Sequence, residues 1–559
     1  MATALIAPPA APDLRDALRR VWFGSALYPL FLRARPPGAF FAVVPDPWPG
    51  DPARADSLLA GQFNSHGRGG SIEGDPWRRA DADPLWLAEL NKFEWLRDLR
   101  DVGQPLAANM AAAKVDEWIV ANPRWSPIAW RADVLSARVV MWIRHYDFLA
   151  SGATEGFAAR LVASLAQQRR HLERLIPGGL AGARLLAAMK AAVIVDLAFI
   201  KAGPAHERAL ERSLVRLSRA LARIVLDDGT IAERSPRQQF AALRDLIDLR
   251  ASLLSADRSG PPTIQAAIER AAAMLRFFRH GDGGLACFNG SDEGDPALID
   301  LVLARTGATA KPPKEAPRGG FQRLAAGAAQ IIADTGAPPR RGLDLDAHAG
   351  TLSFEFSLGD ERMIVNCGAY PGLAPEWRST MRYTAAHSTV VVDDTNSSEV
   401  MTDGPLEHPP SNVAAKRFER DGALWLELSH DGWRSLFGIV HKRRLWLSPD
   451  GTDLRGEDTL AGPDGKRVKK TASGRKFAVR FHLHPDVKAS LAQSGASALL
   501  RLPSGQGWRL RASGGTIGLA ESVYLGDGRR IRRAAQLVLT GALGPDGSKI
   551  KWAFTRVEG

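Results

Sequence analysis

The chain has 559 residues, which is long for one core, and its 45% hydrophobic content is sufficient for two or three domains. Lys and Arg total 73 against 61 Asp and Glu, and the formal charge of +12 is dispersed along the chain instead of forming a basic block. This distribution argues against a nucleic-acid-binding tail and suits an acidic polysaccharide partner, although a GC-rich genome that selects Arg over Lys produces the same charge.

Cysteine content and hydropathy argue against a disulfide-rich secreted protein and against a membrane-spanning protein. Two cysteines, Cys287 and Cys367, are too few for a disulfide framework, and two reduced thiols are the simpler interpretation. The N-terminal stretch MATALIAPPAAPDLRDALRR has no basic segment ahead of an apolar one, so it does not predict a signal peptide. The nearest approach to a transmembrane helix, LLAAMKAAVIVDLAFI, contains Lys190 and Asp196, so no membrane span is expected.

The first half of the chain has helical periodicity. Leu and Ala recur at i, i+3, i+4 and i+7 in segments such as ADVLSARVVMWIRHYDFLA and ERALERSLVRLSRALARIVL. Short breaks that contain Gly, Pro or Asp separate these segments, for example NPRWSP and KAGPAHE. Because short loops place successive helices antiparallel, residues 1–312 are predicted to form an α-helical domain, either a bundle or a closed ring of hairpins.

The period changes to two beyond the Pro- and Lys-rich stretch ATAKPPKEAPRGG. Segments such as TLSFEFSL, LWLELSH, FAVRFHLH and AAQLVLTGAL predict short strands, with turn signals such as SPDGTD and PSGQG between them. A run of strands separate from the helices predicts an antiparallel β-sandwich over residues 313–559. The expected fold class is therefore a multidomain α+β protein.

The first polar cluster is DDGTIAERSPRQQ, residues 227–239, which follows one predicted helix and opens the next. Ser235 and Pro236 are typical of an N-cap and a first helical position. Five further side chains would surround this helix N-terminus, where an anion is favoured: Glu233, Arg234, Arg237, Gln238 and Gln239. Plain capping of the helix explains the same spacing.

Three further clusters fall in the predicted β-domain. They are Asp346 and His348 in DLDAHAGTLSFEFS, Asn366, Cys367, Tyr370 and Arg378 in VNCGAYPGLAPEWRS, and Arg382, Tyr383 and His387 in RSTMRYTAAHSTVVVDD. Imidazole and thiolate are good zinc ligands, and adjacent strands lie about 4.8 Å apart, so His348, Cys367 and His387 could converge on one ion with Asn366 or water. Structural histidines and a buried cysteine are the alternative.

Several motifs together resemble the heparinase II/III superfamily of polysaccharide lyases. They are HAGTLSFE, VNCGAY, EWR, TAAHSTVVVDD and SHDGW, preceded by WLAELNKFEWLRDL and NPRWSPIAWRADVLSARVVMWI in the helical half. The resemblance extends from about residue 80 to about residue 540. It implies an (α/α) toroid of helical hairpins followed by an antiparallel β-sandwich, with an anionic glycan bound in a cleft between them.

The resemblance also implies β-elimination at a uronic acid. This reaction needs a cation or donor at the C5 carboxylate, a base for the C5 proton and an acid for the departing O4. The catalytic residues expected on this basis are Tyr383, His387, Arg382 and Gln238. The expected substrate contacts are Arg234, Arg237, Gln239, Glu233, Arg378 and Tyr370, because arginine can bind a carboxylate through two hydrogen bonds. The expected ligands of a Zn²⁺ cofactor are His348, Cys367, His387 and Asn366.

The chain departs from the lyase pattern at the positions of proton transfer. The resemblance places Gly182 and Ala183 about where family lyases commonly carry an Asn-His pair, and Gln238 where they usually carry a catalytic tyrosine. Asp346 replaces the first histidine of a His-x-His loop, and Asn366 replaces an aspartate that often serves the metal. The sequence therefore predicts the scaffold of the family without its standard proton-transfer groups.

Three functions compete. The first is a lyase on anionic glycans whose proton-transfer groups have moved to Tyr370, Tyr383 or His387. The second is a non-catalytic glycan-binding or accessory protein of envelope polysaccharide metabolism, and the third is a structural scaffold. The expected partner is an acidic polysaccharide or oligosaccharide, not nucleic acid. The resemblance indicates the periplasm or cell envelope, the lack of a signal peptide indicates the cytoplasm, and the oligomeric state does not follow from the sequence.

Overall fold

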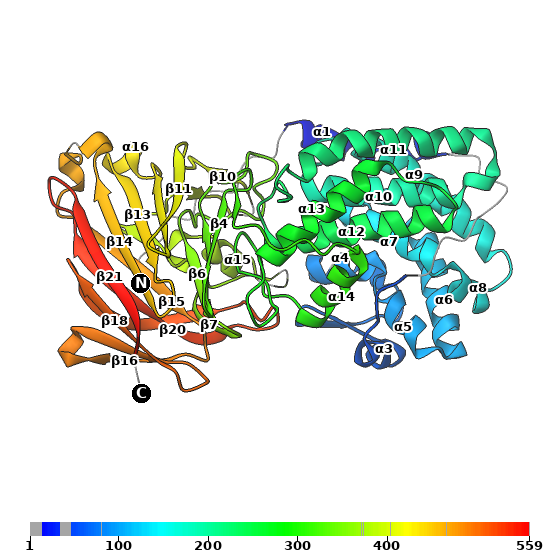
Figure 1. The fold of residues 1–559 in the computed structure, drawn as a ribbon. Helices are drawn as coiled ribbons and strands as arrows, with labels where there is room; N and C mark the ends of the chain where they lie inside the picture. The colour runs from blue at the N-terminus through cyan, green and yellow to red at the C-terminus, as the bar shows by residue number, and fades with distance from the viewer. Residues whose placement is uncertain are drawn as a thin grey trace. The chain divides into compact units, whose positions relative to one another are not determined.

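A computed structural model describes residues 14–33, 46–79, 81–370, 372, 374–402, 404–465 and 467–557 of the chain (Figure 1). These residues divide into two compact units. The helical unit comprises the described residues within 11–224 and 242–268, and the β-sandwich unit comprises those within 225–241 and 269–559. The division between the two units falls inside α12 (Pro236–Ser255) and inside α13 (Pro262–Phe277). The change from helices to strands comes later, between α14 (Pro296–Thr306) and β3 (Glu315–Ala316), near the predicted boundary at 312.

Amphipathic helices form most of the helical unit. They are α1 (Leu14–Gly24), α2 (Tyr28–Leu32), α3 (Pro52–Leu59), α4 (Pro84–Lys92), α5 (Leu96–Val102), α6 (Pro105–Ala121), α7 (Ala132–Arg144), α8 (Tyr146–Ser151), α9 (Phe157–Leu175), α10 (Gly182–Ala198) and α11 (Pro204–Ile224), with the 3₁₀ turns η1 (Pro76–Arg78) and η2 (Ile200–Ala202). Proline often supplies the first residue, because its fixed φ suits a helix start and its missing N–H has no partner there. None of the described helices is long and apolar enough to cross a membrane.

A short β-hairpin interrupts the helical unit. Strands β1 (Gln62–Ser65) and β2 (Arg68–Ser71) pair antiparallel around His66 and Gly67, whose φ angles are 50° and 75°. Two positive φ angles are typical of the tight turn that joins such strands. The expectation of a purely helical first half is therefore wrong at this hairpin. Residues 1–13, which include most of the segment judged not to be a signal peptide, lie outside the described residues.

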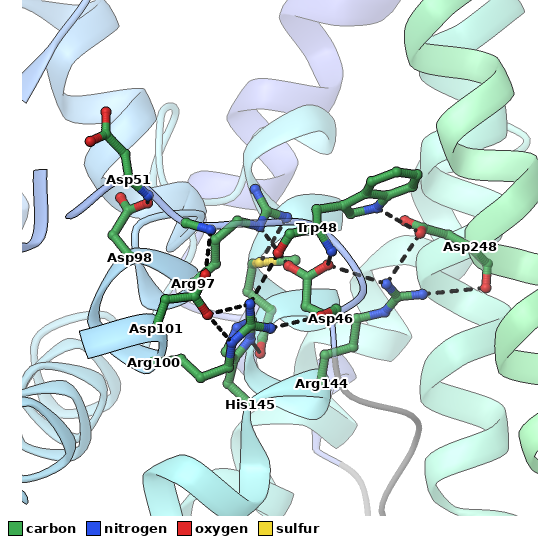
Figure 2. Close-up of polar contacts among 12 residues, drawn as sticks. Asp46, Trp48, Asp51, Arg97, Asp98, Arg100, Asp101, Arg144, His145 and Asp248 are labelled. Carbon is green, nitrogen blue, oxygen red and sulfur yellow. Dashed lines mark hydrogen bonds and ion pairs between the residues drawn. The ribbon is translucent and has the colours of Figure 1, made fainter. Parts of the chain in front are cut away.

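A buried polar cluster joins the segment 46–51 to helices of the same unit (Figure 2). Asp46 Oδ2 accepts a hydrogen bond from Arg97 Nε at 2.6 Å. Asp248 Oδ1 accepts from Trp48 Nε1 at 2.9 Å and from Arg144 Nη1 at 3.2 Å. All five residues are buried. Two carboxylates and two guanidinium groups therefore compensate each other inside the helical unit.

The charge state of Asp248 reflects these neighbours. Burial alone would raise its pKa, but the positive charges of Arg144, Lys190 and Arg244 lower the pKa to about 2. Asp248 is thus ionised at neutral pH, and its removal would take one of two carboxylates from Arg144, which also pairs with Asp46, and from Lys190, which also pairs with Asp245.

Two large antiparallel sheets form the sandwich of the β-sandwich unit, which also contains a two-stranded sheet of β9 (Glu399–Val400) and β10 (Leu406–Glu407) (Figure 1). The eight-stranded sheet has the order β11-β12-β13-β14-β21-β18-β17-β16, and the other has the order β19-β20-β15-β7-β6-β5-β4-β3, with β8 also paired to β15. One hydrophobic core contains side chains of both sheets. Within it, the rings of Phe354 and Trp552, one from each sheet, stack with their centroids 5.9 Å apart.

The elements of this unit beyond β3 and α12–α14 have the following bounds. The strands are β4 (Phe321–Ala326), β5 (Ala329–Asp334), β6 (Phe354–Leu358), β7 (Glu361–Val365), β8 (Val390–Val392), β9 (Glu399–Val400), β10 (Leu406–Glu407), β11 (Val413–Arg420), β12 (Ala423–His430), β13 (Val440–Leu447), β14 (Asp453–Ala461), β15 (Lys476–Leu483), β16 (Lys488–Ala492), β17 (Ser497–Arg501), β18 (Gly507–Ser513), β19 (Thr516–Tyr524), β20 (Arg532–Ala542) and β21 (Ser548–Val557). The helices and turns are α15 (Pro375–Met381), α16 (Arg434–Phe437), η3 (Thr384–Ala386), η4 (Pro463–Gly465), η5 (Lys470–Ala472) and η6 (Gln493–Gly495).

The predicted order of helices followed by antiparallel strands is confirmed, and with it the α+β fold class. The sequence analysis did not identify α15 or the strands β14, β18 and β21. These strands carry Lys, Arg, Asp or Glu on their exposed side, so that their hydrophobic alternation is hard to recognise.

Replacement of Asp248 by Ala should destabilise the helical unit by about 3 kcal/mol, because buried Arg144 and partly buried Lys190 lose the carboxylate that they share. Chemical denaturation of the full chain measures this loss. The matched control is Glu207→Ala, which removes an ion pair with Arg258 whose side chains are 45% and 43% exposed. Such a pair contributes about 0.5 kcal/mol. Equal stability changes in the two variants would contradict the structural role of the buried cluster.

Candidate functional site

The start of α12 is bound by a loop of the β-sandwich unit. Pro236 is the first helical residue, with Ser235 before it, as the sequence predicts. The backbone N–H of Arg237 donates to the Ser291 hydroxyl at 2.9 Å, and the hydroxyls of Ser235 and Ser291 lie 3.1 Å apart. The N–H of Arg237, one donor of the predicted anion site, is thus already bonded to a serine of the chain, which satisfies it as a capping side chain does.

Arg234 is an internal residue. It is 6% exposed and adopts a left-handed backbone conformation with φ of 58°. Its guanidinium donates to the carbonyl oxygens of Gly319 at 2.6 Å, Ala337 at 2.7 Å and Gly320 at 3.0 Å, and it forms an ion pair with Asp334. Because these partners hold the guanidinium inside the unit, the structure does not support the predicted contact of Arg234 with substrate.

Two other predicted substrate contacts also lie inside the unit. Gln239 is fully buried; its Oε1 accepts from the N–H of Ile231 at 2.8 Å, and its Nε2 donates to the carbonyls of Gly229 at 2.9 Å and Ala271 at 3.0 Å. Glu233 is 8% exposed. The hydrogen bonds of Gln239 hold the loop ahead of α12, so this side chain is not positioned to meet a ligand, whereas a role of Glu233 in substrate binding stays a prediction.

Arg237 and Gln238, in contrast, are only half-buried. Gln238 Nε2 donates to Asp346 Oδ2 at 2.9 Å and so links α12 to the loop that precedes β6. Within the described ranges, the Arg237 guanidinium makes no hydrogen bond or ion pair. Its positive charge acts on His348. The two residues of the first sequence cluster that remain accessible therefore adjoin the second cluster.

His348 and His387 form a directed chain of hydrogen bonds. His387 Nδ1 lies 2.8 Å from the carbonyl oxygen of Tyr383, which can only accept, so this nitrogen carries the proton. His387 Nε2 therefore accepts from His348 Nδ1, 3.0 Å away. The remaining nitrogen, His348 Nε2, keeps its lone pair and has no hydrogen-bond partner among the residues that the structure describes.

Both imidazoles are neutral at physiological pH. Burial lowers the pKa of His387 to about 4. Burial also lowers the pKa of His348 well below its ordinary value, and the neighbouring His387, Arg382 and Arg237 lower it further. A neutral His348 can accept a hydrogen bond, but it is a weak base.

Arg382 and Tyr383 differ in their availability. Arg382 is 4% exposed, and its guanidinium donates to the carbonyls of Ala347 at 2.9 Å, Gly404 at 2.7 Å and Met401 at 3.1 Å. Its predicted catalytic role is therefore not supported, since these bonds hold the loop that carries His348. Tyr383 is half-buried against a small apolar cluster, and its hydroxyl has no hydrogen bond within the described part of the chain.

Cys367 has a different histidine as its partner. Its sulfur lies 3.4 Å from His482 Nδ1, which is also 2.8 Å from the Ser522 hydroxyl. Burial raises the pKa of Cys367 to about 12, so the thiol stays protonated. These three residues line a cavity of about 500 Å³ together with Trp377 and Tyr383.

The last two predicted substrate contacts lie beside this cavity wall. Tyr370 packs against a cluster made of Cys367, Ala369, Met381, Ala386 and Leu525. Arg378 is half-buried on α15, which also carries Trp377. The Tyr370 side chain therefore has a packing role, and its part in substrate binding stays a prediction, as does that of Arg378.

The four predicted zinc ligands do not converge on one point in the described part of the chain. In the described part of the chain, no group of three or more His, Cys, Asp or Glu side chains is arranged to hold a metal ion. His348 and His387 bond to each other, Cys367 contacts another histidine, and Asn366 Oδ1 accepts from the N–H of Ser388 at 3.0 Å. A tetrahedral set of four ligands is therefore not present, and no step below depends on a metal. Zinc binding in solution stays a prediction.

A buried carboxylate that was not predicted from the sequence, Glu355, contacts these loops. Glu355 of β6 is fully buried and accepts hydrogen bonds from His280 Nε2 at 2.9 Å and from the N–H groups of Cys287 at 3.1 Å and Asn366 at 3.0 Å. The Asn366 side-chain amide adds a longer bond at 3.4 Å. A glutamate inside the apolar motif LSFE was the available signal, because buried carboxylates almost always have polar partners.

The cluster can bind an anion more readily than it can move a proton. Arg237 supplies a cation that can pair with a carboxylate. His348 Nε2 supplies a lone pair, but its pKa is low, and the Gln238 amide does not titrate. Besides His348, the groups of this region that can exchange a proton are the Asp346 carboxyl group and the Tyr383 hydroxyl.

Comparison with protein families matches the second half of the chain. A family described as "Heparinase II/III-like, C-terminal" covers residues 308–553. Over nearly the whole length, the chain is 35% identical to FtsZ-localized protein C of Caulobacter vibrioides, covering 97% of this chain and 94% of that protein.

Solved structures show the same fold at low identity. The crystal structure of a heparinase III superimposes with a TM-score of 0.72 at 13% identity, covering 98% of this chain and 92% of that chain. The heparan sulfate lyase HepC from Pedobacter heparinus superimposes with a TM-score of 0.61 at 16% identity, covering 98% and 89%. These likenesses confirm the toroid-plus-sandwich fold.

Replacement of Asn366 by Asp should destabilise the β-sandwich unit by about 3 kcal/mol at neutral pH, because it places a second carboxylate beside buried Glu355. One carboxyl of the pair would bind a proton more tightly in the folded chain than in the unfolded chain, so stability should partly recover as the pH falls from 7 to about 5. Urea denaturation at several pH values measures this. Exposed Asn64→Asp is the control, with an expected change within about 0.5 kcal/mol.

The same variant examines the metal prediction. Without a metal site, added Zn²⁺ leaves the Asn366→Asp variant as unstable as before. If Zn²⁺ binds stoichiometrically and restores stability, the loops around Asn366 do provide metal ligands.

Proposed function

The chain belongs to the heparinase II/III superfamily, and we propose that it binds a carboxylate-bearing glycan without cleaving it. The observation that carries this proposal is the combination of a free cation with unavailable catalytic groups. The Arg237 guanidinium makes no bond to the described residues, whereas Arg382 and His387 are committed to hydrogen bonds inside the β-sandwich unit.

Binding would depend on Arg237. A guanidinium that has not spent its donors on the chain can form two parallel hydrogen bonds with a sugar carboxylate. Gln238, Asp346 and His348 lie in the two segments beside it and offer amide, carboxylate and imidazole groups that suit sugar hydroxyls. None of these contacts requires a change of protonation.

Cleavage would lack its usual groups. By the resemblance, Gly182 and Ala183 stand about where family lyases commonly carry Asn and His, and Gln238 stands where they usually carry a tyrosine. β-Elimination must remove a weakly acidic C–H proton, and a base contributes most when its pKa lies near the working pH. The pKa of His348 is far below that range.

A lyase activity is the second candidate, on one specific observation. His348 Nε2 keeps a lone pair near the charge of Arg237, and the Tyr383 hydroxyl has no partner within the described ranges. In such a reaction Arg237 would stabilise the carboxylate, His348 would accept the C5 proton, and Tyr383 would donate a proton to O4.

Replacement of Arg237 by Ala should weaken the affinity for a uronic-acid polymer by about tenfold, since it removes a charge-assisted contact. Isothermal titration calorimetry with alginate, hyaluronan and polygalacturonate measures the affinity. Exposed Arg216→Ala, on α11, is the matched control and should bind like the wild type. Unchanged affinity in Arg237→Ala would contradict the proposed binding site.

The same polymers separate binding from cleavage. Cleavage by β-elimination generates an unsaturated sugar with a new ultraviolet absorbance. We expect binding with no increase in absorbance over prolonged incubation. An increase that disappears in His348→Gln and Tyr383→Phe would establish the lyase instead.

We further propose that the chain acts where FtsZ assembles, because it is 35% identical over 97% of its length to FtsZ-localized protein C. A fluorescent fusion expressed in Caulobacter vibrioides should form a focus or band that coincides with labelled FtsZ. Depletion of FtsZ should disperse it. A uniform distribution in cells with an intact FtsZ band would contradict this part of the proposal, and it would leave the glycan affinity unaffected.

A further inference from the structure

The exposed side of the eight-stranded sheet carries aromatic residues outside the core. Along β12 and β13, alternate residues are buried in the core, and the residues between them face outward. Trp425 and Trp446 are among the outward residues, as is Phe418 of β11, and all three are half-buried. An exposed antiparallel face ordinarily carries polar residues, so three large rings there suggest a contact surface.

Strand register places these rings in one row. Phe418 pairs with Trp425, Trp425 with Trp446, and Trp446 with Arg455 of β14. Residues paired across antiparallel strands have neighbouring side chains on the same face. The row therefore runs across four strands.

The row continues across β21 and β18. Arg455 pairs with Ala553, and Ala553 pairs with Arg511. Because alanine separates the two arginines, there is space between them above the sheet.

Ring geometry confirms that the aromatic side chains form one surface. The rings of Phe418 and Trp425 stack with centroids 5.7 Å apart and planes at 8°, and the rings of Trp425 and Trp446 lie 6.3 Å apart at 64°. The Arg455 guanidinium lies 4.9 Å from the centroid of Trp446. The arginine and the rings thus support one another on the face of the sheet.

A groove of about 800 Å³ occupies this face. Its lining includes Trp425, Trp446, Arg455, Arg511, Lys551 and Ala553. We call this set the aromatic groove. A volume of this size is in the range of ligand-binding clefts.

The aromatic groove is electropositive. Arg444, Arg455, Arg511 and Lys551 line it against one carboxylate, Glu457. Arg444 and Arg455 pair at 2.9 Å and 2.6 Å with carboxylates beside the groove. The guanidinium of Arg511 makes no hydrogen bond or ion pair within the described ranges. A ligand anion can therefore reach at least one cation that is not already neutralised.

We propose that the aromatic groove is a second glycan-binding site, which takes a polysaccharide with carboxylates on part of its sugars. The apolar C–H face of a pyranose ring packs on an indole, and Arg511 binds a carboxylate of a neighbouring sugar through two hydrogen bonds. The inference rests on the proposed function only for the class of ligand. It uses none of the same residues, and the groove lies on the sheet opposite to the one that contains β6.

Charge density favours this ligand over single-stranded nucleic acid. Nucleic acid also stacks on aromatic rings, but it carries a phosphate at every nucleotide and follows a continuous basic track. Three of the four cations that line the aromatic groove already pair with carboxylates: Arg444, Arg455 and, at 3.9 Å from Glu457, Lys551. A glycan with one carboxylate on alternate sugars matches this sparse positive charge better.

The test is calorimetric titration of the full chain with a short hyaluronan oligosaccharide, in which every second sugar carries a carboxylate. The variants are the double mutant Trp446→Ala/Arg511→Ala, the single mutant Arg237→Ala, and Trp446→Phe, which keeps an aromatic face. We expect the double mutant to lose about tenfold in affinity at one site and to bind less oligosaccharide per chain. Trp446→Phe should retain most of the affinity. A neutral chitooligosaccharide of equal length should bind more weakly than hyaluronan.

The outcomes separate this inference from the proposed function. Loss of binding in the double mutant but not in Arg237→Ala supports the aromatic groove and contradicts the Arg237 site. Loss of binding in Arg237→Ala but not in the double mutant supports the Arg237 site and contradicts the aromatic groove. An unchanged titration in the folded double mutant overturns the inference, as does tighter binding of oligothymidylate than of hyaluronan at the same salt concentration.

Discussion

The buried carboxylate of Glu355 is the constraint on which the site in the β-sandwich unit depends. It is fully buried and bonds to His280, to the N–H of Cys287 and to Asn366. These partners belong to the loop after α13 and to the end of β7, so one carboxylate fixes both segments. A buried carboxyl group is costly without such hydrogen-bond partners, so the two segments are held in place as long as the core is intact.

The loop after α13 then positions the residues of the candidate site. Asn289 Oδ1 accepts from the N–H of His348, and Ser291 accepts from the N–H of Arg237. The asparagine at 366 donates to Glu355 and accepts from Ser388, which an aspartate could do only with a proton or a metal to offset the second charge. Hydrogen bonds thus take the place of charge compensation at this position, and they leave the site rigid but poorly equipped for proton transfer.

Periodicity was sufficient to predict the fold, because helices and strands differ in a pattern that a single sequence displays. It was insufficient for the site, because the roles of its arginines depend on distant partners. Arg234 is internal because Asp334, a hundred positions further along the chain, lies beside it. Arg237, three positions away, is half-buried, and its guanidinium makes no such bonds within the described ranges. Likewise Cys367 was predicted to converge with His348 on one ion, whereas the histidine that its sulfur contacts is His482 on β15. Residue type and spacing identify candidates, and only the tertiary contacts determine which of them are free.

A binding protein built in this way gains affinity from the number of contacts with one polymer. Arg237 and the aromatic groove belong to the same β-sandwich unit, and each offers a cation without a partner in the described chain. If both take sugars of one polysaccharide, the second contact becomes intramolecular, and overall affinity exceeds that of either surface alone. The excess of 12 positive charges adds a long-range attraction that accelerates encounter and weakens with salt. If the chain binds such a polymer without cleaving it, as proposed, retention on the polymer depends only on the number and spacing of these contacts and needs no catalytic step.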